Sequence, residues 1–554
     1  MAIKNLTVAA DFETTTDPND CRVWAACAVD VDSLETVHIS NSIDAFFDWL
    51  KDKNTKCFFH NLKFDGEFIL SYLMRNGYKY SKTPEPRTFS TLISDMGAWY
   101  SITVIFEKKN KKYKKVVFQD SLKKLPFPVA VIAKAFKLDD QKLSIDYSAP
   151  RAVGHALTDE EKQYIVNDCR IVAAALKIQF DEGLKKMTTA SDALNGYKEI
   201  ITKDRFLQWF PTLPLDLDAD IRKAYKGGFT YLKPQHKNAR GLKGITLDVN
   251  SLYPSVMYNC MLPYGYPMYF EGEPVLDEVF NLFIVHIRCA FEVKKDHIPT
   301  IQIKKSMRFM PTEYITSSDG EIIDLHLTSV DLALFLDHYD TYDLDYINGY
   351  KFKGVKGFFR DYIEHWMHIK ETETGAKRQL AKLMLNSLYG KFATNPISGV
   401  KVPALDVEEY VQYVDEQESP RDPVYTAMGC FITAYARDKT IRSAQAVYDR
   451  FIYADTDSLH LIGEDVPEGL EIHPTRLGAW KHEGTFTDSV FIRAKTYMET
   501  IDGVNKVTCA GMPDRVKEHV TYENFKSGSV FSGKLVPRRC VGGVVLVDTT
   551  FTIK

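Results

Sequence analysis

The chain has 554 residues, of which 45% are hydrophobic and 26% charged, and its formal net charge is −4. This composition is ordinary for a globular protein and excludes a disordered or fibrous chain, and the length predicts three or four domains. No apolar run approaches the roughly 18 residues of a membrane span, and residues 1–13 lack the pattern of a secretory signal.

Nine cysteines are scattered along the chain without a C-x-x-C pair. This argues against a disulfide framework and against a structural zinc site, and it favours reduced thiols in a cytosol. The charge balance by itself also argues against a nucleic-acid partner, because proteins that bind nucleic acid usually carry a basic domain.

The pattern of an α/β domain extends over the first 185 or so residues. Apolar runs predict strands at residues 6–10, 57–59, 101–106 and 116–118, and the last two form a hairpin. The six lysines within residues 108–115 are interpreted as the solvated tip of that hairpin. Thr158 and Glu161 have the spacing of a capping box before an apolar stripe, so a helix is expected to start there.

The rest of the chain contains clear signals for turns and helix boundaries. Residues 211–214 have a proline at each end and predict a turn after the first domain. Residues 358–392 predict two helices interrupted near Gly375, which form a helical hairpin. Residues 406–422 carry seven carboxylates and Pro420, and they predict an exposed excursion and not part of a core.

Carboxylates occupy defined faces of the first domain. Asp11 and Glu13 are two apart on a predicted strand and therefore point to one side. Asp65 precedes an apolar helical stretch, and Tyr164 and Asp168 are four apart on the capped helix, so they share a face. Converging carboxylates repel one another unless a cation intervenes, and hard oxygen ligands suit Mg²⁺ or Mn²⁺. The pattern predicts a paired-metal site that attacks a phosphodiester.

A second set of acids lies further along the chain. Asp248 ends an apolar strand, and Asp455 and Asp457 are expected on one face of a tight hairpin at residues 451–459. The second helix of the helical hairpin carries a polar stripe at spacings of four, four and three. That stripe consists of Arg378, Lys382, Asn386 and Tyr389. Cations facing two metal-binding acids are what a nucleoside triphosphate requires, because they neutralise and position its phosphates.

Eight motifs follow one another along the chain. They are Asp11-Phe12-Glu13-Thr14-Thr15, His60-Asn61-Leu62-Lys63-Phe64-Asp65-Gly66, Tyr164-x-x-x-Asp168, Tyr225-Lys226-Gly227-Gly228, Asp248-Val249-Asn250-Ser251-Leu252-Tyr253-Pro254, Lys382-Leu383-Met384-Leu385-Asn386-Ser387-Leu388-Tyr389-Gly390, Tyr453-Ala454-Asp455-Thr456-Asp457-Ser458 and Lys495-Thr496-Tyr497. In this order they resemble family B DNA polymerases, specifically the protein-primed branch of small tailed bacteriophages with linear genomes, the phi-twenty-nine type. The resemblance spans essentially the whole chain.

The resemblance implies an α/β and α+β multidomain fold. A ribonuclease-H-like 3′–5′ exonuclease domain precedes a right-hand polymerase of palm, fingers and thumb with two insertions. The implied boundaries are 1–188 for the exonuclease domain, 189–259 and 426–509 for the palm, 260–357 for the first insertion, 358–393 for the fingers, 394–425 for the second insertion and 510–554 for the thumb. Residues 498–509 are short for this family, which predicts a trimmed palm hairpin.

The resemblance also implies roles for individual residues. In the exonuclease, the implied metal ligands are Asp11, Glu13, Asp65 and Asp168, Tyr164 orients the attacking water and Lys142 is the catalytic lysine. The implied contacts to the frayed primer end are Thr14, His60, Asn61, Phe64, Ser121 and Leu122. In the polymerase, the implied metal ligands are Asp248, Val249 and Asp457, with Asp455 as a supporting acid. The implied nucleotide contacts are Tyr253 as a steric gate, Lys370, Arg378, Lys382, Asn386 and Tyr389, and the implied DNA contacts are Tyr225, Gly227, Gly228, Lys495 and Tyr497.

Cofactors, partners and location follow from the same resemblance. It implies two Mg²⁺ or Mn²⁺ ions per active site, primer–template DNA, dNTPs and a single-stranded-DNA-binding protein. A terminal protein that acts as primer would dock on the first insertion and form a heterodimer with the chain. The second insertion would close a ring round the template for processive, strand-displacing synthesis. The implied location is the cytoplasm of an infected bacterial host.

Three other hypotheses are disfavoured by the residues present. A stand-alone exonuclease with a DNA-binding remainder is disfavoured because Asp248, Lys382 and Asp457 are all present. A non-catalytic protein that holds a terminal protein on DNA is disfavoured by the full set of acids. A reverse transcriptase also carries two acids on a hairpin, but here a complete set of exonuclease motifs precedes them.

Overall fold

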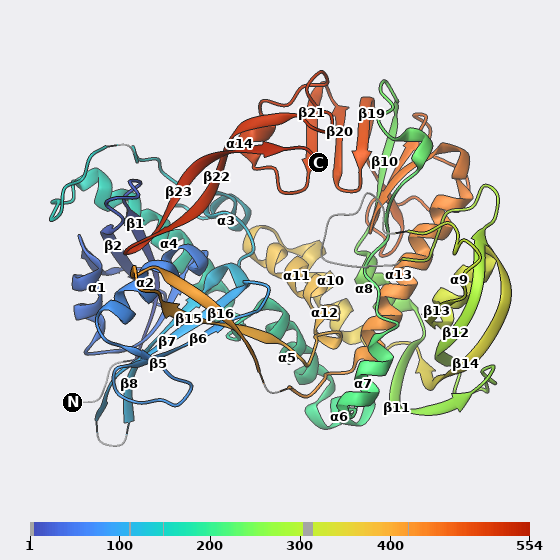
Figure 1. Ribbon diagram of the computed structural model, residues 1–554, viewed down its shortest axis with the longest axis horizontal. Helices are drawn as coiled ribbons and strands as arrows, with labels where there is room; N and C mark the ends of the chain where they lie inside the picture. Colours follow the sequence, from blue (N-terminus) through green and yellow to red (C-terminus); the bar gives the residue numbers. More distant parts are fainter. Residues whose placement is uncertain (1–4, 110–111, 148, 303–313, 419) are drawn as a thin grey trace.

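Two large β-sheets organise the fold (Figure 1). The computed structural model of the protein describes residues 5–109, 112–147, 149–302, 314–418 and 420–554. Within these ranges, no helix combines the length and apolar character needed to cross a membrane.

The first sheet has eight strands and is built by the first 120 residues. In it, β1 (Asn5–Thr14) lies between the antiparallel β2 (Val23–Asp30) and the parallel β4 (Asn54–Phe59). The other strands are β3 (Thr36–Ser40), β5 (Lys79–Tyr80), β6 (Thr88–Ile93), β7 (Trp99–Lys109) and β8 (Lys112–Asp120). All four predicted strands are present, and β7 and β8 form the predicted hairpin. The described lysines of its tip are exposed except Lys114, which pairs with Glu107 at 2.7 Å, and residues 110–111 lie outside the described ranges.

Helices cover both faces of this sheet, because alternate residues of its strands belong to two different cores. Val8 and Ala10 pack with α1 (Ile43–Leu50) and α2 (Leu62–Arg75), whereas Ala9 packs with α3 (Val129–Phe136) and α4 (Asp159–Asp181). The predicted capping box of Thr158 and Glu161 is present at the start of α4. A single 3₁₀ turn, η1 (Ser121–Lys123), follows β8.

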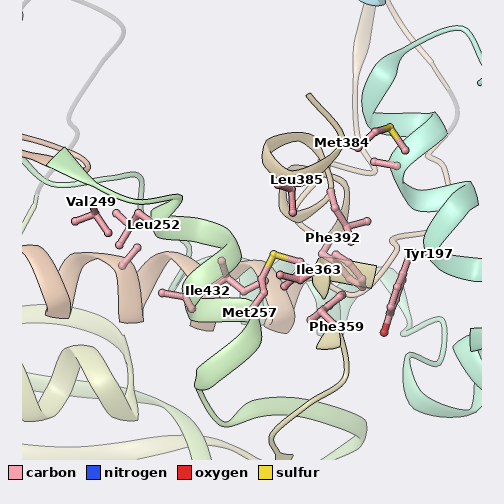
Figure 2. Packing of buried hydrophobic residues seen from close by; sticks show 14 of the residues in the cluster. Tyr197, Val249, Leu252, Met257, Phe359, Ile363, Met384, Leu385, Phe392 and Ile432 are labelled. Carbon is pink, nitrogen blue, oxygen red and sulfur yellow. The ribbon is translucent and has the colours of Figure 1, made fainter. Parts of the chain in front are cut away.

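A helical region connects the two sheets. It contains α5 (Thr189–Ile201), α6 (Lys203–Trp209), α7 (Leu215–Arg222), α10 (Arg360–Thr372), α11 (Gly375–Ser387) and α12 (Tyr389–Phe392). The predicted turn at residues 211–214 separates α6 from α7. The predicted helical hairpin is α10 and α11, which turn at Gly375 with φ +57°. Tyr197 of α5 packs on Phe359 with ring centroids 4.7 Å apart, within the core that Figure 2 shows.

The second sheet has seven strands in the order β21-β20-β19-β10-β18-β17-β9. They are β9 (Thr230–Leu232), β10 (Gly244–Val249), β17 (Phe451–Asp455), β18 (Ser458–Ile462), β19 (Trp480–Arg493), β20 (Thr496–Ile501) and β21 (Val504–Cys509). Side chains of α8 (Leu252–Asn259) and α13 (Thr426–Ala446) share its core. β20 and β21 are joined by two residues, Asp502 and Gly503, which both have positive φ. This tight turn accounts for the shortness of the hairpin at residues 498–509.

A smaller sheet lies beside α13 at the edge of the molecule, on the right in Figure 1. Its order is β11-β14-β12-β13, from β11 (Leu262–Glu271), β12 (Leu282–Val293), β13 (Ile323–Thr328) and β14 (Tyr339–Val355), with α9 (Ser329–His338) packed on it. These elements fall within the expected first insertion, of which residues 303–313 lie outside the described ranges.

Two hairpins reach back to the first domain. One is β15 (Gly399–Leu405) with β16 (Val411–Gln417), and the other is β22 (Val530–Cys540) with β23 (Gly543–Thr552), preceded by α14 (Asp514–Lys517). The prediction of an exposed excursion at residues 406–422 is wrong for part of it. Val411 is buried in the core around α2, and Glu409 pairs with Arg75 at 3.1 Å. Its acidic side chains face solvent or basic partners, which explains why composition alone indicated exposure. Ser419 lies outside the described residues.

Two candidate active sites

Four acidic side chains of the first domain line one cavity of about 720 Å³. Asp11 and Glu13 lie on β1, Asp65 lies in the first turn of α2, and Asp168 lies on α4. Tyr164, one turn before Asp168 on α4, lines the same cavity. The structure therefore brings together acids that are carried by three separate elements.

Burial and mutual repulsion oppose the ionisation of these carboxylates together. Burial, followed by the charge of Asp168, raises the pKa of Asp11 to about 7. Burial and the charge of Asp11 raise the pKa of Glu13 to about 9, and burial is also the main cause of the strongly raised pKa of Asp65. One oxygen of Asp65 and one of Asp168 are buried without a hydrogen-bond partner. Repelling, unsatisfied carboxylate oxygens are the donor set that fits a hard divalent cation.

Lys142 lies at this cavity with its Nζ 2.5 Å from Oδ2 of Asp168. Among the described residues, no three His, Cys, Asp or Glu side chains converge closely enough to enclose an ion as they stand. Lys142 supplies positive charge to the same carboxylates, and its charge lowers the pKa of Asp11 and of Glu13.

The residues expected to hold a primer end are organised by Asp120, which the sequence did not single out. Its Oδ1 accepts the backbone N–H of Asn61 at 3.1 Å and of Leu122 at 3.0 Å. His60 joins the same group, because its Nδ1 lies 3.0 Å from Oγ of Ser121. The cavity wall itself includes Thr14, His60, Asn61 and Phe64. Asp120 at the end of β8 is one more carboxylate at a strand end, which is the signal that could have found it.

Further side chains of this cavity carry no local signal. The Tyr147 hydroxyl lies 2.7 Å from the Tyr164 hydroxyl. Tyr147 belongs to a stretch of sequence without hydrophobic periodicity. Four side chains come from the distant β22–β23 hairpin. They are Leu535, Val545, Leu546 and Asp548. The tip of that hairpin can approach α2 because a Cβ on Gly543 would lie 2.4 Å from the Phe68 ring, so only glycine fits.

The second pair of acids lies side by side in the second sheet. Asp248 on β10 pairs in register with Ser458 on β18, and the N–H of Val249 donates to the carbonyl of Asp457 at 2.7 Å. Burial, followed by the charge of Asp457, raises the pKa of Asp248 to about 7, and burial raises the pKa of Asp457. Oδ1 of Asp248 is buried without a hydrogen-bond partner. These oxygens fit a hard cation for the same reasons as in the first cavity.

Asp455 does not share a strand face with Asp457, so that prediction is wrong. β17 ends at Asp455, Thr456 has φ +58°, and Asp457 lies in the turn before β18, so two-residue alternation does not apply. Asp455 instead accepts hydrogen bonds from Nζ of Lys495 at 2.9 Å and from Oγ1 of Thr230 at 3.1 Å. Its charge is thereby neutralised, and it anchors the turn that presents Asp457.

A cavity of about 600 Å³ lies between Asp248 and the helical hairpin. Its wall includes Lys370 of α10 with Arg378 and Lys382 of α11. Nζ of Lys370 donates to Oγ of Ser251 at 2.8 Å. Burial, followed by the charges of Lys382 and Arg378, lowers the pKa of Lys370. Three cations that repel one another beside a carboxylate pair are suited to bind a polyphosphate.

Two aromatic rings stack next to this cavity without forming its wall. Tyr253 of α8 and Tyr389 have ring centroids 4.0 Å apart and an interplanar angle of 16°. Tyr389 begins α12, so the predicted stripe of four residues runs over two helices. Asn386 belongs to α11 and, like Tyr389, is not on the cavity wall.

The loop of residues 225–228 packs against the turn at Asp457 and is hydrogen-bonded to α13. Arg437 of α13 donates to the carbonyl of Gly227 at 2.8 Å. A Cβ on Gly228 would lie 2.7 Å from Oγ1 of Thr456, so the close approach requires glycine. Arg437 had no sequence signal, because a lone arginine in a long helix is usually a surface residue.

Strands β19 and β20 complete the site. Lys481, the register partner of Asp248, and Glu483 line the cavity, and their strand alternation is a signal that sequence reasoning missed. The Tyr497 ring stacks on Phe491 with centroids 5.3 Å apart. Tyr497 is therefore packed within the sheet, while Lys495 faces Asp455.

Comparisons with known proteins identify the relatives of this chain. Residues 48–471 match the family model described as DNA polymerase type B, organellar and viral. The DNA polymerase of Bacillus phage phi29 is 50% identical over 568 aligned residues, which cover 99% of this chain and 98% of the relative. The DNA polymerase of Streptococcus phage Cp-1 is 36% identical over 99% of this chain and 98% of its own.

Solved structures extend the likeness to the whole fold. The orthorhombic crystal form of phi29 DNA polymerase superposes with a TM-score of 0.97 at 49% identity, covering all of both chains. Its ternary complex with primer–template DNA and incoming nucleotides gives 0.95 with the same identity and coverage. The fold is thus the exonuclease-plus-right-hand arrangement that the resemblance implied. The chain belongs to the organellar and viral type B DNA polymerases, in the phi29-type group, and is a DNA-directed DNA polymerase with 3′–5′ exonuclease activity.

Proposed function

We propose that the chain copies DNA at the cavity beside Asp248 and Asp457, the polymerase cavity. We propose further that it trims unpaired 3′ ends at the cavity lined by Asp11, Asp65 and Asp168, the exonuclease cavity. One observation carries the proposal: a single chain holds two separate groups of neighbouring carboxylates with raised pKa values, and of the two cavities only the polymerase cavity is also lined by three cations. That difference suits a triphosphate at one site and a plain phosphodiester at the other.

Divalent metal dependence comes with the family, and we propose two Mg²⁺ or Mn²⁺ ions per site. The residues that would hold them are Asp248, Val249 through its carbonyl and Asp457 in the polymerase, and Asp11, Glu13, Asp65 and Asp168 in the exonuclease. When bound, such ions neutralise phosphate charge and activate the attacking oxygen.

The polymerase residues bind and orient the nucleotide. Lys370, Arg378 and Lys382 hold the triphosphate, because their ammonium and guanidinium groups converge on one cavity. The stacked Tyr253 and Tyr389, next to that cavity, offer a rigid surface to the sugar and the nascent pair, and we assign Asn386 to the same nucleotide-binding region. The DNA strand runs past Tyr225, Gly227 and Gly228, and past Lys495 and Tyr497.

The exonuclease residues hold a frayed end and move protons. Stacking on Phe64 and polar contacts from the Asp120-organised group grip a single strand without sequence preference. That group comprises His60, Asn61, Ser121 and Leu122, and we assign a further polar contact to Thr14 on the cavity wall. The Tyr164 hydroxyl orients the attacking water, and the Lys142 ammonium balances charge beside Asp168.

Replacement of Tyr253 by Val is expected to relax discrimination against ribonucleotides. The ring excludes a ribose 2′-hydroxyl by its volume, so its loss should lower the dNTP/rNTP preference by about 10- to 100-fold. Single-nucleotide incorporation kinetics with dNTP and rNTP measure this ratio. Tyr253→Phe keeps the ring and serves as the matched control, and an unchanged preference in Tyr253→Val would rule out the gate.

The partners proposed here rest on the family. Solved phi29 polymerase complexes contain primer–template DNA and incoming nucleotides, and we propose the same substrates for this chain. We also propose a terminal protein that primes synthesis, a single-stranded-DNA-binding protein and action in the cytoplasm of the infected host. The terminal protein would dock on the sheet of β11 to β14.

We propose that the domains follow the implied boundaries. They are the exonuclease domain (1–188), the palm (189–259 and 426–509), the first insertion (260–357), the fingers (358–393), the second insertion (394–425) and the thumb (510–554). The contacts of the β15–β16 and β22–β23 hairpins with the first domain support a closed ring round the DNA. Such a ring supports processive, strand-displacing synthesis.

Initiation on a linear template with a purified terminal protein is the test of protein priming. We expect a covalent protein–dNMP adduct, seen with labelled dNTP on a denaturing gel, that requires both Mg²⁺ and Asp248. A DNA-primed template tested in parallel should be extended whether or not terminal protein is added. Extension without any adduct would contradict protein priming, and degradation without extension would favour the stand-alone exonuclease.

A further inference from the structure

A segment without helix or strand carries two side chains of the exonuclease cavity. Residues 141–157, described apart from Ser148, lie between α3 and α4 and include Lys142 and Tyr147. Backbone that belongs to no helix or sheet must be held by side chains if its own side chains are to keep fixed positions. The contacts that do this identify residues outside the cavity on which its geometry depends.

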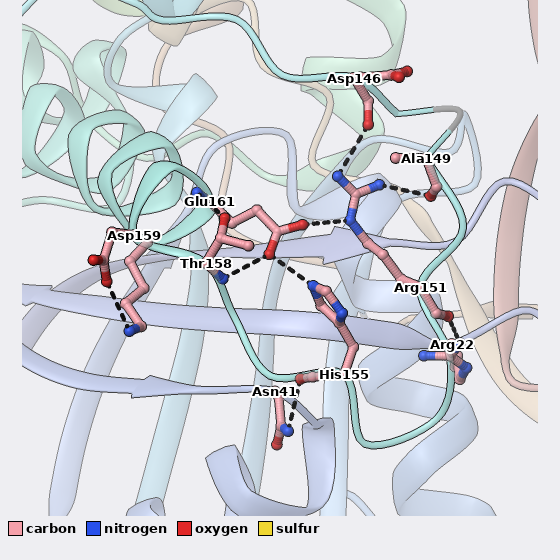
Figure 3. A network of polar contacts seen from close by, with 10 residues as sticks. Arg22, Asn41, Asp146, Ala149, Arg151, His155, Thr158, Asp159 and Glu161 are labelled. Carbon is pink, nitrogen blue, oxygen red and sulfur yellow. Dashed lines mark hydrogen bonds and ion pairs between the residues drawn. The ribbon is translucent and has the colours of Figure 1, made fainter.

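Arg151 is the centre of these contacts (Figure 3). Its Nη2 donates to the carbonyl of Asp146 at 2.9 Å, its Nη1 to the carbonyl of Ala149 at 3.1 Å, and its Nε to Oε1 of Glu161 at 2.8 Å. The guanidinium also lies over the ring of Trp24, 4.0 Å from the ring centroid. Only 6% of the Arg151 side chain and 9% of the Glu161 side chain are exposed, so this pair is little screened by solvent.

Glu161 fastens the same segment to the first turn of α4. Its Oε2 accepts from Nε2 of His155 at 2.7 Å and from the backbone N–H of Thr158 at 2.9 Å. Although burial opposes ionisation, the hydrogen bonds from Thr158, His155 and Arg151 lower the pKa of Glu161 to about 2. The carboxylate is therefore charged at neutral pH and saturated with donors.

The helix face that begins at Glu161 continues into the active site. Glu161, Tyr164 and Asp168 are spaced by three and four residues and lie on one side of α4. The segment meets this face at three successive levels: Arg151 on Glu161, Tyr147 on Tyr164 with 2.7 Å between the hydroxyls, and Lys142 on Asp168 at 2.5 Å. Only the last two levels belong to the cavity.

We propose that Arg151 and Glu161 are positioning residues of the exonuclease, which set Lys142 and Tyr147 against α4. The proposal rests on the exonuclease site proposed above. The rigid fork of the guanidinium is essential, because three of its nitrogens bind three acceptors at fixed angles, which a lysine cannot reproduce. Arg151 hydrogen-bonds none of the four cavity acids and is not on the cavity wall, and its charge reaches Glu13 only through space. Its three hydrogen bonds therefore act on the cavity through Lys142 and Tyr147.

The test measures digestion of a 5′-labelled single-stranded oligonucleotide by the full-length enzyme with Mg²⁺. We expect Arg151→Gln and Arg151→Lys each to lower the exonuclease kcat by about 10- to 100-fold, with KM changed far less, because misplacement of catalytic groups lowers turnover. Glu161→Gln should act in the same direction. DNA-primed polymerisation by the same preparations should stay at the unmodified level. Lys162→Gln, which breaks an exposed pair with Asp159 on the same turn, is the matched control.

A double-mutant cycle separates positioning from general stabilisation. In a background that carries both Lys142→Ala and Tyr147→Phe, adding Arg151→Gln should lower the exonuclease kcat by less than a further threefold, because both contacts through which Arg151 acts are already absent. If the loss of exonuclease kcat caused by Arg151→Gln were as large in this background as in the unmodified enzyme, the proposal would be overturned. Full exonuclease activity of Arg151→Lys would also overturn the proposal. The positive charge at this position, acting through space on Glu13, would then be sufficient without the hydrogen bonds of the guanidinium. Equal loss of polymerisation and exonuclease with a lower melting temperature in all three variants would assign a merely structural role. Exonuclease activity that survives Asp65→Asn would instead refute the site itself.

Discussion

Replacement of Asp457 by Asn is expected to abolish nucleotide incorporation and to leave the 3′–5′ exonuclease intact. Asn preserves the shape of the side chain and the backbone bond between Val249 and the Asp457 carbonyl. It removes the charge that, together with Asp248, fits a divalent cation. Loss of such a ligand lowers kcat by about 10³-fold or more. Incorporation of one labelled dNTP on a primed template and digestion of a single strand, both with one enzyme preparation, measure the two activities.

A matched control lies in the same sheet. Asp502 is exposed in the tight turn between β20 and β21 and has φ +53°, a conformation that Asn also tolerates. Asp502→Asn makes the same carboxylate-to-amide change and should leave both activities unaltered. Incorporation by Asp457→Asn within tenfold of the unmodified enzyme would contradict the assignment. Loss of both activities together would show that the change disturbs the fold.

Elements with a strong local signal could be predicted from sequence. The capping box at Thr158 and Glu161, the helical hairpin around Gly375 and the acid at the end of β10 are all found where their patterns placed them. Each pattern depends on residues within one or two turns of one another. The convergence of Asp248 with Asp457 was implied only by the family resemblance, because the two acids are 209 residues apart and only the fold brings them together.

Side chains that long-range packing delivers could not be predicted. Leu546, near the C-terminus, lines the exonuclease cavity, and nothing in the surrounding sequence indicates that position. The β15–β16 hairpin was wrongly predicted to be exposed, because its acidic residues are typical of a solvent-facing segment. Val411 is in fact buried against the first domain. Asp455 was misplaced because a positive φ at Thr456 ends the strand alternation.

The net charge of −4 concealed a segregation of charge. Residues 351–393 hold nine Lys or Arg against four Asp or Glu, and this segment includes the cations of the polymerase cavity. Acids of the two sites and of residues 406–422 offset them in the total. Composition therefore argued against a nucleic-acid partner because cationic contacts and catalytic acids cancel in the sum.

Replacement of Asp65 by Asn is expected to abolish the exonuclease while raising the melting temperature of the metal-free enzyme. Asp65 is buried beside Asp11, and one of its oxygens has no hydrogen-bond partner. Burial and the neighbouring carboxylates raise its pKa, so the ionised form is disfavoured in the folded state. An amide removes that repulsion and can donate to the oxygens of Asp11. We expect a gain of about 1 kcal/mol in the free energy of unfolding.

Addition of Mg²⁺ should reverse the order of stability. A cation that binds only the folded enzyme stabilises it by mass action, so the melting temperature of the unmodified enzyme should rise with Mg²⁺ concentration. In Asp65→Asn the contribution of the exonuclease site to that rise should be lost, while polymerisation continues. Asp32→Asn, an exposed carboxylate in the turn after β2, is the control that should change neither activity nor the response to Mg²⁺. A variant that digests single strands at the unmodified rate, or that melts lower than the unmodified enzyme in chelator, would show that Asp65 is a structural acid and not a metal ligand.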